Sequence, residues 1–125
     1  MAFETQIDGH TLIMDALPGV GGENKGLPPK PLLLASLGGC TAMDVISIAR
    51  KMRQDITDFE VELTGDTEDE FPKPYTAIHL IYKFKGTDLD KDKLDKAVNL
   101  SQDRYCGISA TLRKALGLTY EIEII

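Results

Sequence analysis

Apolar and polar positions alternate in several short segments of the chain and merge into one long apolar segment near residue 40. Phe3 to Ile7 and Thr11 to Ala16 flank the dipeptide Asp8-Gly9, which suits a tight turn because glycine accepts positive φ. This pattern predicts a β-hairpin at the start of the chain. Residues 18–31 are rich in glycine and proline, so we expect a long loop after the hairpin.

The apolar segment predicts a long helix from Leu32 to Arg53, because Pro31 suits a first helical turn and no proline follows. Up to Ala49 nearly every residue is apolar or small, so we expect most of the helix circumference to be buried. Gly38 and Gly39 indicate the close approach of another backbone or a ligand. One polar stripe, with spacings of four, four and three, interrupts the apolar surface: Ser36, Cys40, Asp44 and Ser47.

The remainder of the chain alternates between strand and helix patterns, and no repeat or linker divides it. We therefore expect one α+β domain over residues 1–125, in which helices cover an antiparallel sheet. The segments expected after the long helix are strands at Phe59–Thr64 and Thr76–Phe84, helices at Asp88–Gln102 and Cys106–Leu116, and a strand at Tyr120–Ile125.

Composition excludes several classes of partner. A chain of 125 residues is long enough to bury a core, and its net charge of −6 opposes binding to nucleic acid or to anionic lipid. We see no signal sequence and no uninterrupted apolar span, so we expect a cytoplasmic protein without membrane partners. Its two cysteines lie 66 positions apart, and a reducing compartment does not favour a permanent disulfide between them. They are reactive, buried and inert, or a transient redox pair.

Cys40 needs an activating group, because it lies in the middle of the predicted helix and only a thiolate is a good nucleophile. Asp44, one turn later, would raise the thiol pKa by itself, so we expect it to hold a cation or a hydrogen bond in place. Cys106 has a better intrinsic setting, because it follows Arg104 and begins a helix. The candidate cations for Cys40 are Arg104, Arg113, Lys30 and His10.

Plainer interpretations of these residues stay open. Both cysteines fit as small core residues, since free cysteine is among the most buried residue types. The polar stripe also fits an ordinary solvent-facing helix edge. The spacing of the two cysteines and of His10 and His79 matches no zinc pattern, so we expect no metal site.

Two segments carry a family resemblance. Residues 32–45, Leu-Leu-Leu-Ala-Ser-Leu-Gly-Gly-Cys-Thr-Ala-Met-Asp-Val, resemble the central-helix motif of the OsmC/Ohr family, and residues 105–109 are similar to its second cysteine motif. The resemblance implies an OsmC-like intertwined homodimer with two long central helices at the interface. It also implies a thiol peroxidase in which Cys40 attacks the hydroperoxide, Cys106 resolves the product and an external thiol reduces the disulfide. No metal or organic cofactor is implied.

Three hypotheses about function follow. The first is a hydroperoxide reductase of oxidative-stress defence that prefers organic substrates, with an apolar pocket supplied by Leu33, Leu37, Met43 and Ile46. The second is a non-peroxidatic redox-sensing or small-molecule-binding relative. Characterised peroxidases of the family use an arginine in the N-terminal strands and a glutamate before the first cysteine. This chain has no arginine before Arg50 and no glutamate in residues 28–31, so Arg104 is the candidate substitute. A structural interaction protein with unreactive cysteines is the third alternative.

Overall fold

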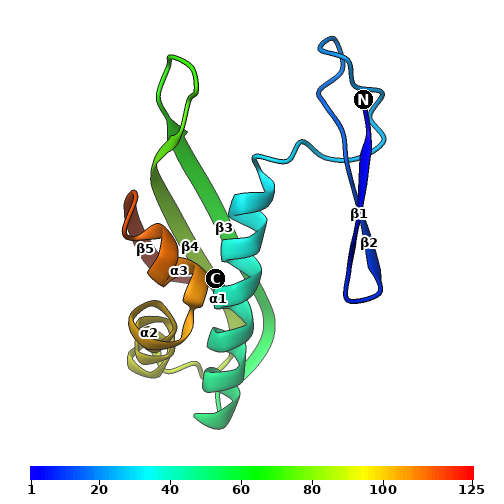
Figure 1. Ribbon diagram of the computed structural model, residues 1–125. Coiled ribbons are helices and arrows are strands. Elements are labelled where there is room, and N and C mark those ends of the chain that lie inside the picture. The colour runs from blue at the N-terminus through cyan, green and yellow to red at the C-terminus, as the bar shows by residue number, and fades with distance from the viewer. The chain divides into compact units, whose positions relative to one another are not determined.

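The structure is a computed structural model that describes residues 1–125. Its backbone forms two compact units, Met1–Ala35 and Ser36–Ile125, and each is described by itself. Helices and strands are both present, which confirms the predicted α+β class (Figure 1). The elements in chain order are β1 (Phe3–Ile7), β2 (His10–Met14), α1 (Leu32–Lys51), β3 (Asp55–Thr67), β4 (Tyr75–Thr87), α2 (Lys91–Leu100), the π-helix η1 (Ser101–Tyr105), α3 (Gly107–Leu112) and β5 (Gly117–Ile124).

The first unit begins with the predicted hairpin. Strands β1 and β2 pair antiparallel, and Ile7 lies opposite His10, so the turn consists of Asp8 and Gly9 alone. Asp8 has a φ of 48° and Gly9 a φ of 81°. Two successive positive φ angles are what a two-residue hairpin turn of the favoured type requires, and Asp-Gly adopts them at low cost. The sequence prediction is therefore confirmed at this turn.

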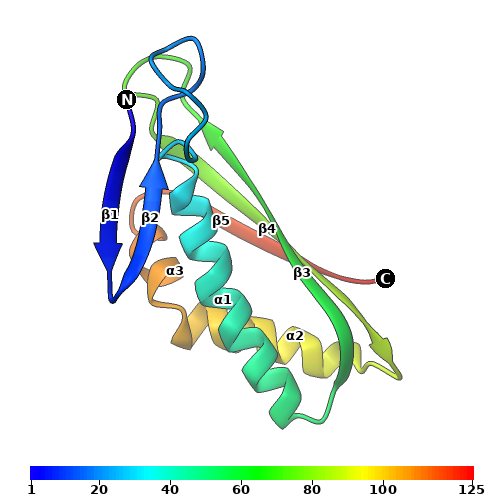
Figure 2. The ribbon, with the colours of Figure 1, turned by 90° about the vertical axis from the view of Figure 1, so that its right-hand side faces the viewer.

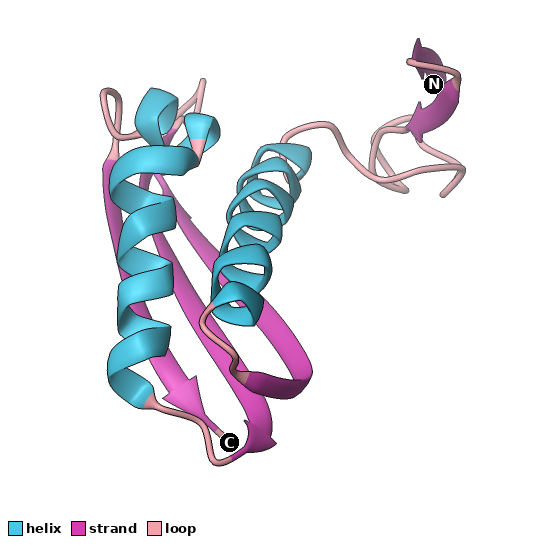
Figure 3. Ribbon diagram, turned by 90° about the horizontal axis from the view of Figure 1, so that it is seen from below, coloured by secondary structure: helices cyan, strands magenta, loops and turns pink.

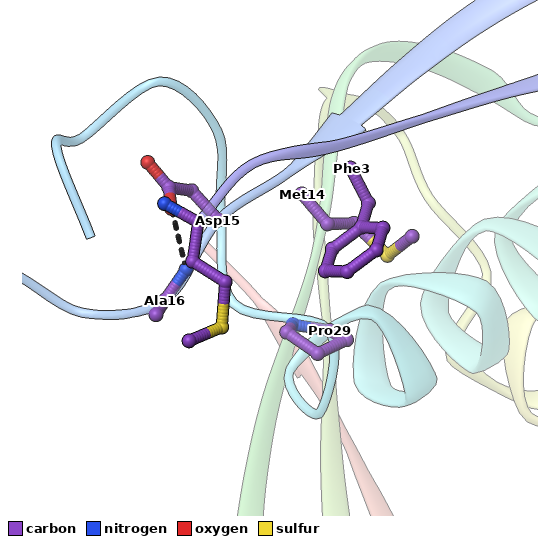
Figure 4. A pocket seen from close by; sticks show the side chains of 6 residues that line it. Phe3, Met14, Asp15, Ala16 and Pro29 are labelled. Atoms are coloured by element: carbon purple, nitrogen blue, oxygen red, sulfur yellow. Dashed lines mark hydrogen bonds and ion pairs between the residues drawn. The ribbon is translucent and has the colours of Figure 1, made fainter. Parts of the chain in front are cut away.

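The loop after the hairpin is organised by the buried carboxylate of Asp15. Its oxygens accept backbone N–H hydrogen bonds from Glu23 at 2.9 Å, Ala16 at 2.8 Å and Lys25 at 3.2 Å. The Glu23 hydrogen bond is the largest influence that holds the pKa of Asp15 down, at about 2. Beside this carboxylate lies an apolar pocket of about 210 Å³, shown in Figure 4, which is lined by Met1, Phe3, Met14, Asp15, Ala16 and Pro29.

The second unit contains a three-stranded sheet in the order β3, β4, β5. Strands β3 and β4 are antiparallel, but β4 and β5 run in the same direction, as Figure 2 shows. The sheet is therefore mixed, which corrects the antiparallel pairing expected at this edge. The reason is the connection: α2, η1 and α3 carry the chain back across the sheet before β5 begins, and such a crossover allows parallel pairing.

The strands are longer than the apolar alternation predicted. Strand β3 begins four residues before Phe59, because the backbone ladder continues through residues 55–58, which are polar and exposed except for Ile56. Within β4 the alternation is confirmed, and the fully buried side chains there are Ile78, Leu80, Tyr82 and Phe84. The opposite face of the sheet carries polar pairs such as Lys83 with Glu62. One face of this sheet therefore forms the core.

Helix α1 buries one line of residues rather than most of its circumference. The side chains with no exposure recur every four residues: Leu37, Thr41, Val45 and Ala49. On the opposite side Met43 is 76% exposed. The expectation of burial all round is therefore wrong for the single chain, because one small sheet covers only one side of a helix. By length and composition α1 would also suffice to cross a membrane, a test that core helices of other proteins pass too.

Helix α1 ends two residues earlier than predicted. Arg53 adopts a φ of 60°, in the left-handed region. The N–H of Gln54 donates to the carbonyl of Ala49 at 3.0 Å, and that of Arg53 to Arg50 at 2.9 Å. These are the two hydrogen bonds of a Schellman termination, which closes a helix by satisfying its last carbonyl groups.

Helices α1 and α2 cover the same face of the sheet, as the view in Figure 3 shows. The hydroxyl of Tyr82 on β4 is hydrogen-bonded to Thr41 of α1 at 2.7 Å, and Tyr120 on β5 donates to Asn99 of α2 at 2.7 Å. Tyr120 lies directly opposite Leu80, two residues before Tyr82, so both tyrosines point to one face. This face positions α1, η1 and the segment around Cys106.

Candidate active site

Tertiary structure brings three reactive side chains together in the second unit. The thiol sulfurs of Cys40 and Cys106 and a carboxylate oxygen of Asp44 all lie within 4.8 Å of one another. Cys40 and Asp44 come from successive turns of α1 and are half-buried, whereas Cys106 is only 3% exposed. Both thiols are free. The two cysteines are therefore close enough to react with one another after modest side-chain movement.

Cys106 lies at the junction of η1 and α3. Its N–H donates to the carbonyl of Ser101 at 2.7 Å, a spacing of five residues that defines the wider π turn. Its sulfur then caps α3 by accepting the N–H of Ser109 at 3.4 Å. The predicted place of Cys106 at a helix start is confirmed. The hydroxyl of Ser109 is fully buried and has no hydrogen-bond partner.

The surroundings of Cys40 favour the protonated thiol. Burial raises the pKa of Cys40 most, the hydrogen bond with Cys106 raises it further, and the charges of Cys106 and Asp44 act in the same direction. Only the backbone N–H of Ile108 opposes them. The net effect is a raised pKa, so the thiol form of Cys40 predominates at neutral pH in the single chain.

Asp44 terminates a directed chain of buried hydrogen bonds. Its Oδ2 can only accept, so Ser101 Oγ donates to it at 3.0 Å. Thr41 Oγ1 must then donate to Ser101 at 2.8 Å, and Tyr82 to Thr41 at 2.7 Å. Gln102 Nε2 completes the series by donating to the Tyr82 oxygen at 2.6 Å. Asp44 thus holds a hydrogen-bond donor, and that donor fixes η1 against α1 and β4.

Arg104 does not join this cluster. It is exposed, and its guanidinium lies over the ring of Tyr105, 5.7 Å from the centroid. No hydrogen bond or ion pair connects it to Cys40, Cys106 or Asp44. The role expected for Arg104 as a substitute cation beside the cysteines therefore has no contact to support it in the single chain.

Of the other candidate cations, only Arg113 belongs to the second unit. Arg113 is used structurally, because it donates to the backbone carbonyl of Gln102 at 2.9 Å. Lys30 and His10 belong to the first unit. Within the second unit, the cluster of Cys40, Asp44 and Cys106 therefore contains one acidic side chain and no cation paired with it.

A hollow of about 530 Å³ borders Asp44 between α1 and the end of α2. Of the four apolar residues expected to form a pocket, Met43 alone lines this hollow, whereas Leu37 is fully buried and Ile46 borders a different one. These four residues therefore do not line this hollow together. The residues that line the hollow are Met43, Asp44, Ser47, Ile48, Lys51, Leu100 and Tyr105.

Sequence reasoning missed the hydrogen-bonded partners of the cluster. The sequence pattern predicts no role for Thr41, which follows Cys40 in the motif, and it predicts only a strand position for Tyr82. The hydrogen-bond partners of Thr41 and Tyr82 include Ser101 and Gln102, which the sequence places in the last turn of the helix predicted at Asp88–Gln102. These partners lie 20 to 61 positions away in the chain. No local signal reports such distant pairing.

Most of the chain matches a known protein family. Residues 22–121, which include both cysteines and Asp44, match the family model described as OsmC-like protein. The chain belongs to the OsmC-like family. This OsmC-like protein is 38% identical to Protein YhfA of Escherichia coli (strain K12) over 117 residues, which are 94% of the chain and 84% of YhfA.

Solved structures confirm the fold of this OsmC-like protein. The OsmC like protein from Mycoplasma pneumoniae superposes with a TM-score of 0.84 at 17% identity, covering 99% of this chain and 89% of that one. The organic hydroperoxide resistance protein OhrB of Bacillus subtilis gives a TM-score of 0.59 at 20% identity, covering 98% and 96%. At these identities the likeness concerns the fold alone.

Proposed function

We propose that this OsmC-like protein is a cysteine-dependent hydroperoxide reductase of oxidative-stress defence, in which Cys40 attacks and Cys106 resolves. One observation carries the proposal: the two sulfurs lie within 4.8 Å of one another although the residues are 66 positions apart. Cys40 is the more exposed of the two and so is the one that meets a substrate first. Cys106 is buried, and its sulfur lies close to the Cys40 sulfur that becomes oxidised.

The proposed reaction oxidises Cys40 first and then joins it to Cys106. The Cys40 thiolate attacks the outer peroxide oxygen, the O–O bond breaks, and the alkoxide takes up a proton and leaves as an alcohol. Cys40 is then a sulfenic acid. The Cys106 thiolate attacks this sulfur, the S–O bond breaks as the disulfide forms, and the departing hydroxide takes up a proton to become water. An external dithiol reduces the disulfide by exchange and is itself oxidised.

Organic hydroperoxides are the preferred substrates in this proposal. The hollow beside Asp44 is lined partly by the apolar side chains of Met43, Ile48 and Leu100, which suit an alkyl group. A structural relative, OhrB of Bacillus subtilis, is named for organic hydroperoxide resistance. Both points favour an alkyl substrate over hydrogen peroxide.

The proposed assembly is a cytoplasmic homodimer without nucleic acid or membrane partners. Its support is the apolar surface that α1 leaves open, which includes Met43 at 76% exposure and Leu33 at 38%. A second copy of α1 would remove such surface from water. Sedimentation at micromolar concentration distinguishes a dimer from a monomer of 13.7 kDa.

The decisive experiment compares single-cysteine variants in the consumption of cumene hydroperoxide. We expect Cys40→Ser to abolish consumption, and Cys106→Ser to allow one turnover and leave a sulfenic acid that dimedone traps on Cys40. The wild type should lose two hydrogens in intact mass, reversibly with a dithiol. Ser36→Ala, an exposed change on the same helix outside the hollow, is the matched control. Unchanged consumption by Cys40→Ser would contradict the proposal.

The raised pKa of Cys40 favours a second candidate, a non-peroxidatic redox-sensing or small-molecule-binding protein. A binding protein needs no thiolate, and the second unit supplies no cation to stabilise one. The same experiment separates the two candidates. If the folded, reduced wild type leaves cumene hydroperoxide unconsumed, the binding or sensing function replaces the reductase.

A further inference from the structure

The three clustered side chains are also a set of metal ligands, although the sequence spacing shows no zinc motif. Two cysteine sulfurs and one carboxylate oxygen lie within 4.8 Å of one another. Tetrahedral Zn²⁺ binds sulfur at about 2.3 Å and carboxylate oxygen at about 2.0 Å, which places its ligands roughly 3.5–3.8 Å apart. Each pair therefore has to close by at most about 1.3 Å, a distance that side-chain rotation supplies.

Each of the three ligands already has a hydrogen-bond donor. Ser101 Oγ donates to Asp44 Oδ2 at 3.0 Å, which leaves the other carboxylate oxygen available. The N–H of Ser109 donates to Cys106 Sγ at 3.4 Å, and the backbone N–H of Ile108 acts on Cys40. Donors of this kind orient metal ligands and support their negative charge. The Ser101 donor is itself held by Thr41 at 2.8 Å.

The charge balance of the cluster points in the same direction. A metal ion that displaces both thiol protons is bound by two thiolates and a carboxylate, which sum to three negative charges, and no ion pair in the second unit includes Asp44. A divalent cation compensates most of this charge. Soft sulfur ligands select zinc over magnesium or calcium, and three protein ligands leave a fourth position open on the half-buried side of Cys40 and Asp44.

We propose that the reduced protein binds one Zn²⁺ per chain through Cys40, Cys106 and Asp44. Binding displaces the two thiol protons and forms two Zn–S bonds and one Zn–O bond. Oxidation of the cysteines to a disulfide, by diamide for example, removes two of the three ligands and releases the ion. The site goes beyond the proposed reductase activity and does not depend on it, since its readout is metal binding.

The test titrates reduced, metal-free protein with Zn²⁺ and, in parallel, with Co²⁺ as a spectroscopic probe. We expect one ion per chain, and intense sulfur-to-cobalt charge-transfer and tetrahedral ligand-field bands. Cys40→Ser and Cys106→Ser should each weaken binding by more than about 100-fold, since even outer-shell changes cost 10- to 100-fold. Diamide should release the zinc, and a dithiol should restore binding.

Two further variants keep the test decisive if a cysteine variant unfolds. Asp44→Asn removes the oxygen ligand but keeps an acceptor for Ser101, so it should weaken binding while far-UV circular dichroism stays unchanged. Asp103→Asn removes an exposed carboxylate nearby and is the matched control. Binding that survives Asp44→Asn and diamide oxidation, or a cobalt spectrum without thiolate bands, would overturn the proposal and assign the metal to surface groups.

Discussion

Replacing Asp44 with asparagine tests whether this carboxylate supports or opposes the reactivity of Cys40. The charge of Asp44 is one of the influences that raise the pKa of Cys40. Asparagine removes the charge, yet its amide oxygen still accepts the hydrogen bond from Ser101. The variant therefore isolates the electrostatic effect from the structural one. We expect a larger thiolate fraction at neutral pH and faster alkylation of Cys40.

The separation of the two groups sets the magnitude. Two unit charges at 4.8 Å, the largest separation in the cluster, repel by about 0.9 kcal/mol at the dielectric constant of water. This energy corresponds to a roughly fivefold change in thiolate population, and partial burial makes fivefold the lower limit. The pH profile of Cys40 alkylation should therefore shift to lower pH in Asp44→Asn. Alkylation rises with pH through the raised pKa of the wild type, so the variant should reach half of its maximal rate at a lower pH.

The assay follows carbamidomethylation of Cys40 by iodoacetamide, with peptide mass spectrometry to separate it from Cys106. Asp103→Asn removes an equal charge from an exposed position outside the cluster, and its rate should match the wild type. A slower or unchanged rate in Asp44→Asn would refute this reasoning. Such a result would mean that, in solution, Asp44 holds a group that activates Cys40, for example one of the candidate cations.

Three further predictions concern the scaffold. Thr41→Val removes a hydroxyl with two short buried hydrogen bonds and should lower the free energy of unfolding by about 1–3 kcal/mol in urea titrations. The carboxylate of Asp15 has a pKa lowered to about 2 from 3.8, so its stabilising contribution is present above pH about 4 and is lost as the pH falls toward 2. Asp15→Asn should abolish this acid dependence in amide exchange of the surrounding loop, and an unchanged profile would contradict it. In Gly39→Ala the new Cβ meets no atom within 4 Å, so this variant should raise the free energy of unfolding by about 1 kcal/mol. In Gly38→Ala the new Cβ lies 2.8 Å from Leu63, so the increase should be smaller. Equal increases in urea titrations would contradict this packing.

The amino-acid sequence by itself determined the local elements. Asp8-Gly9 predicted the hairpin turn because its backbone preferences are intrinsic to those two residues. Pro31 and the apolar run after it predicted the start of α1 within one residue. The alternation in β4 predicted its buried face. The cysteine motifs also indicated the OsmC-like family, because short segments with fixed spacing carry that information without any tertiary contact.

Only the tertiary structure decided how these elements form the candidate site. The parallel pairing of β5, the π turn at Ser101 and the approach of Cys106 to Cys40 all depend on contacts between distant segments. The hydrogen-bond chain that ends on Asp44 likewise joins α1, β4 and η1. Such contacts are selected by the packing of the whole core, in which each side chain must find a partner in three dimensions, and no local spacing encodes them.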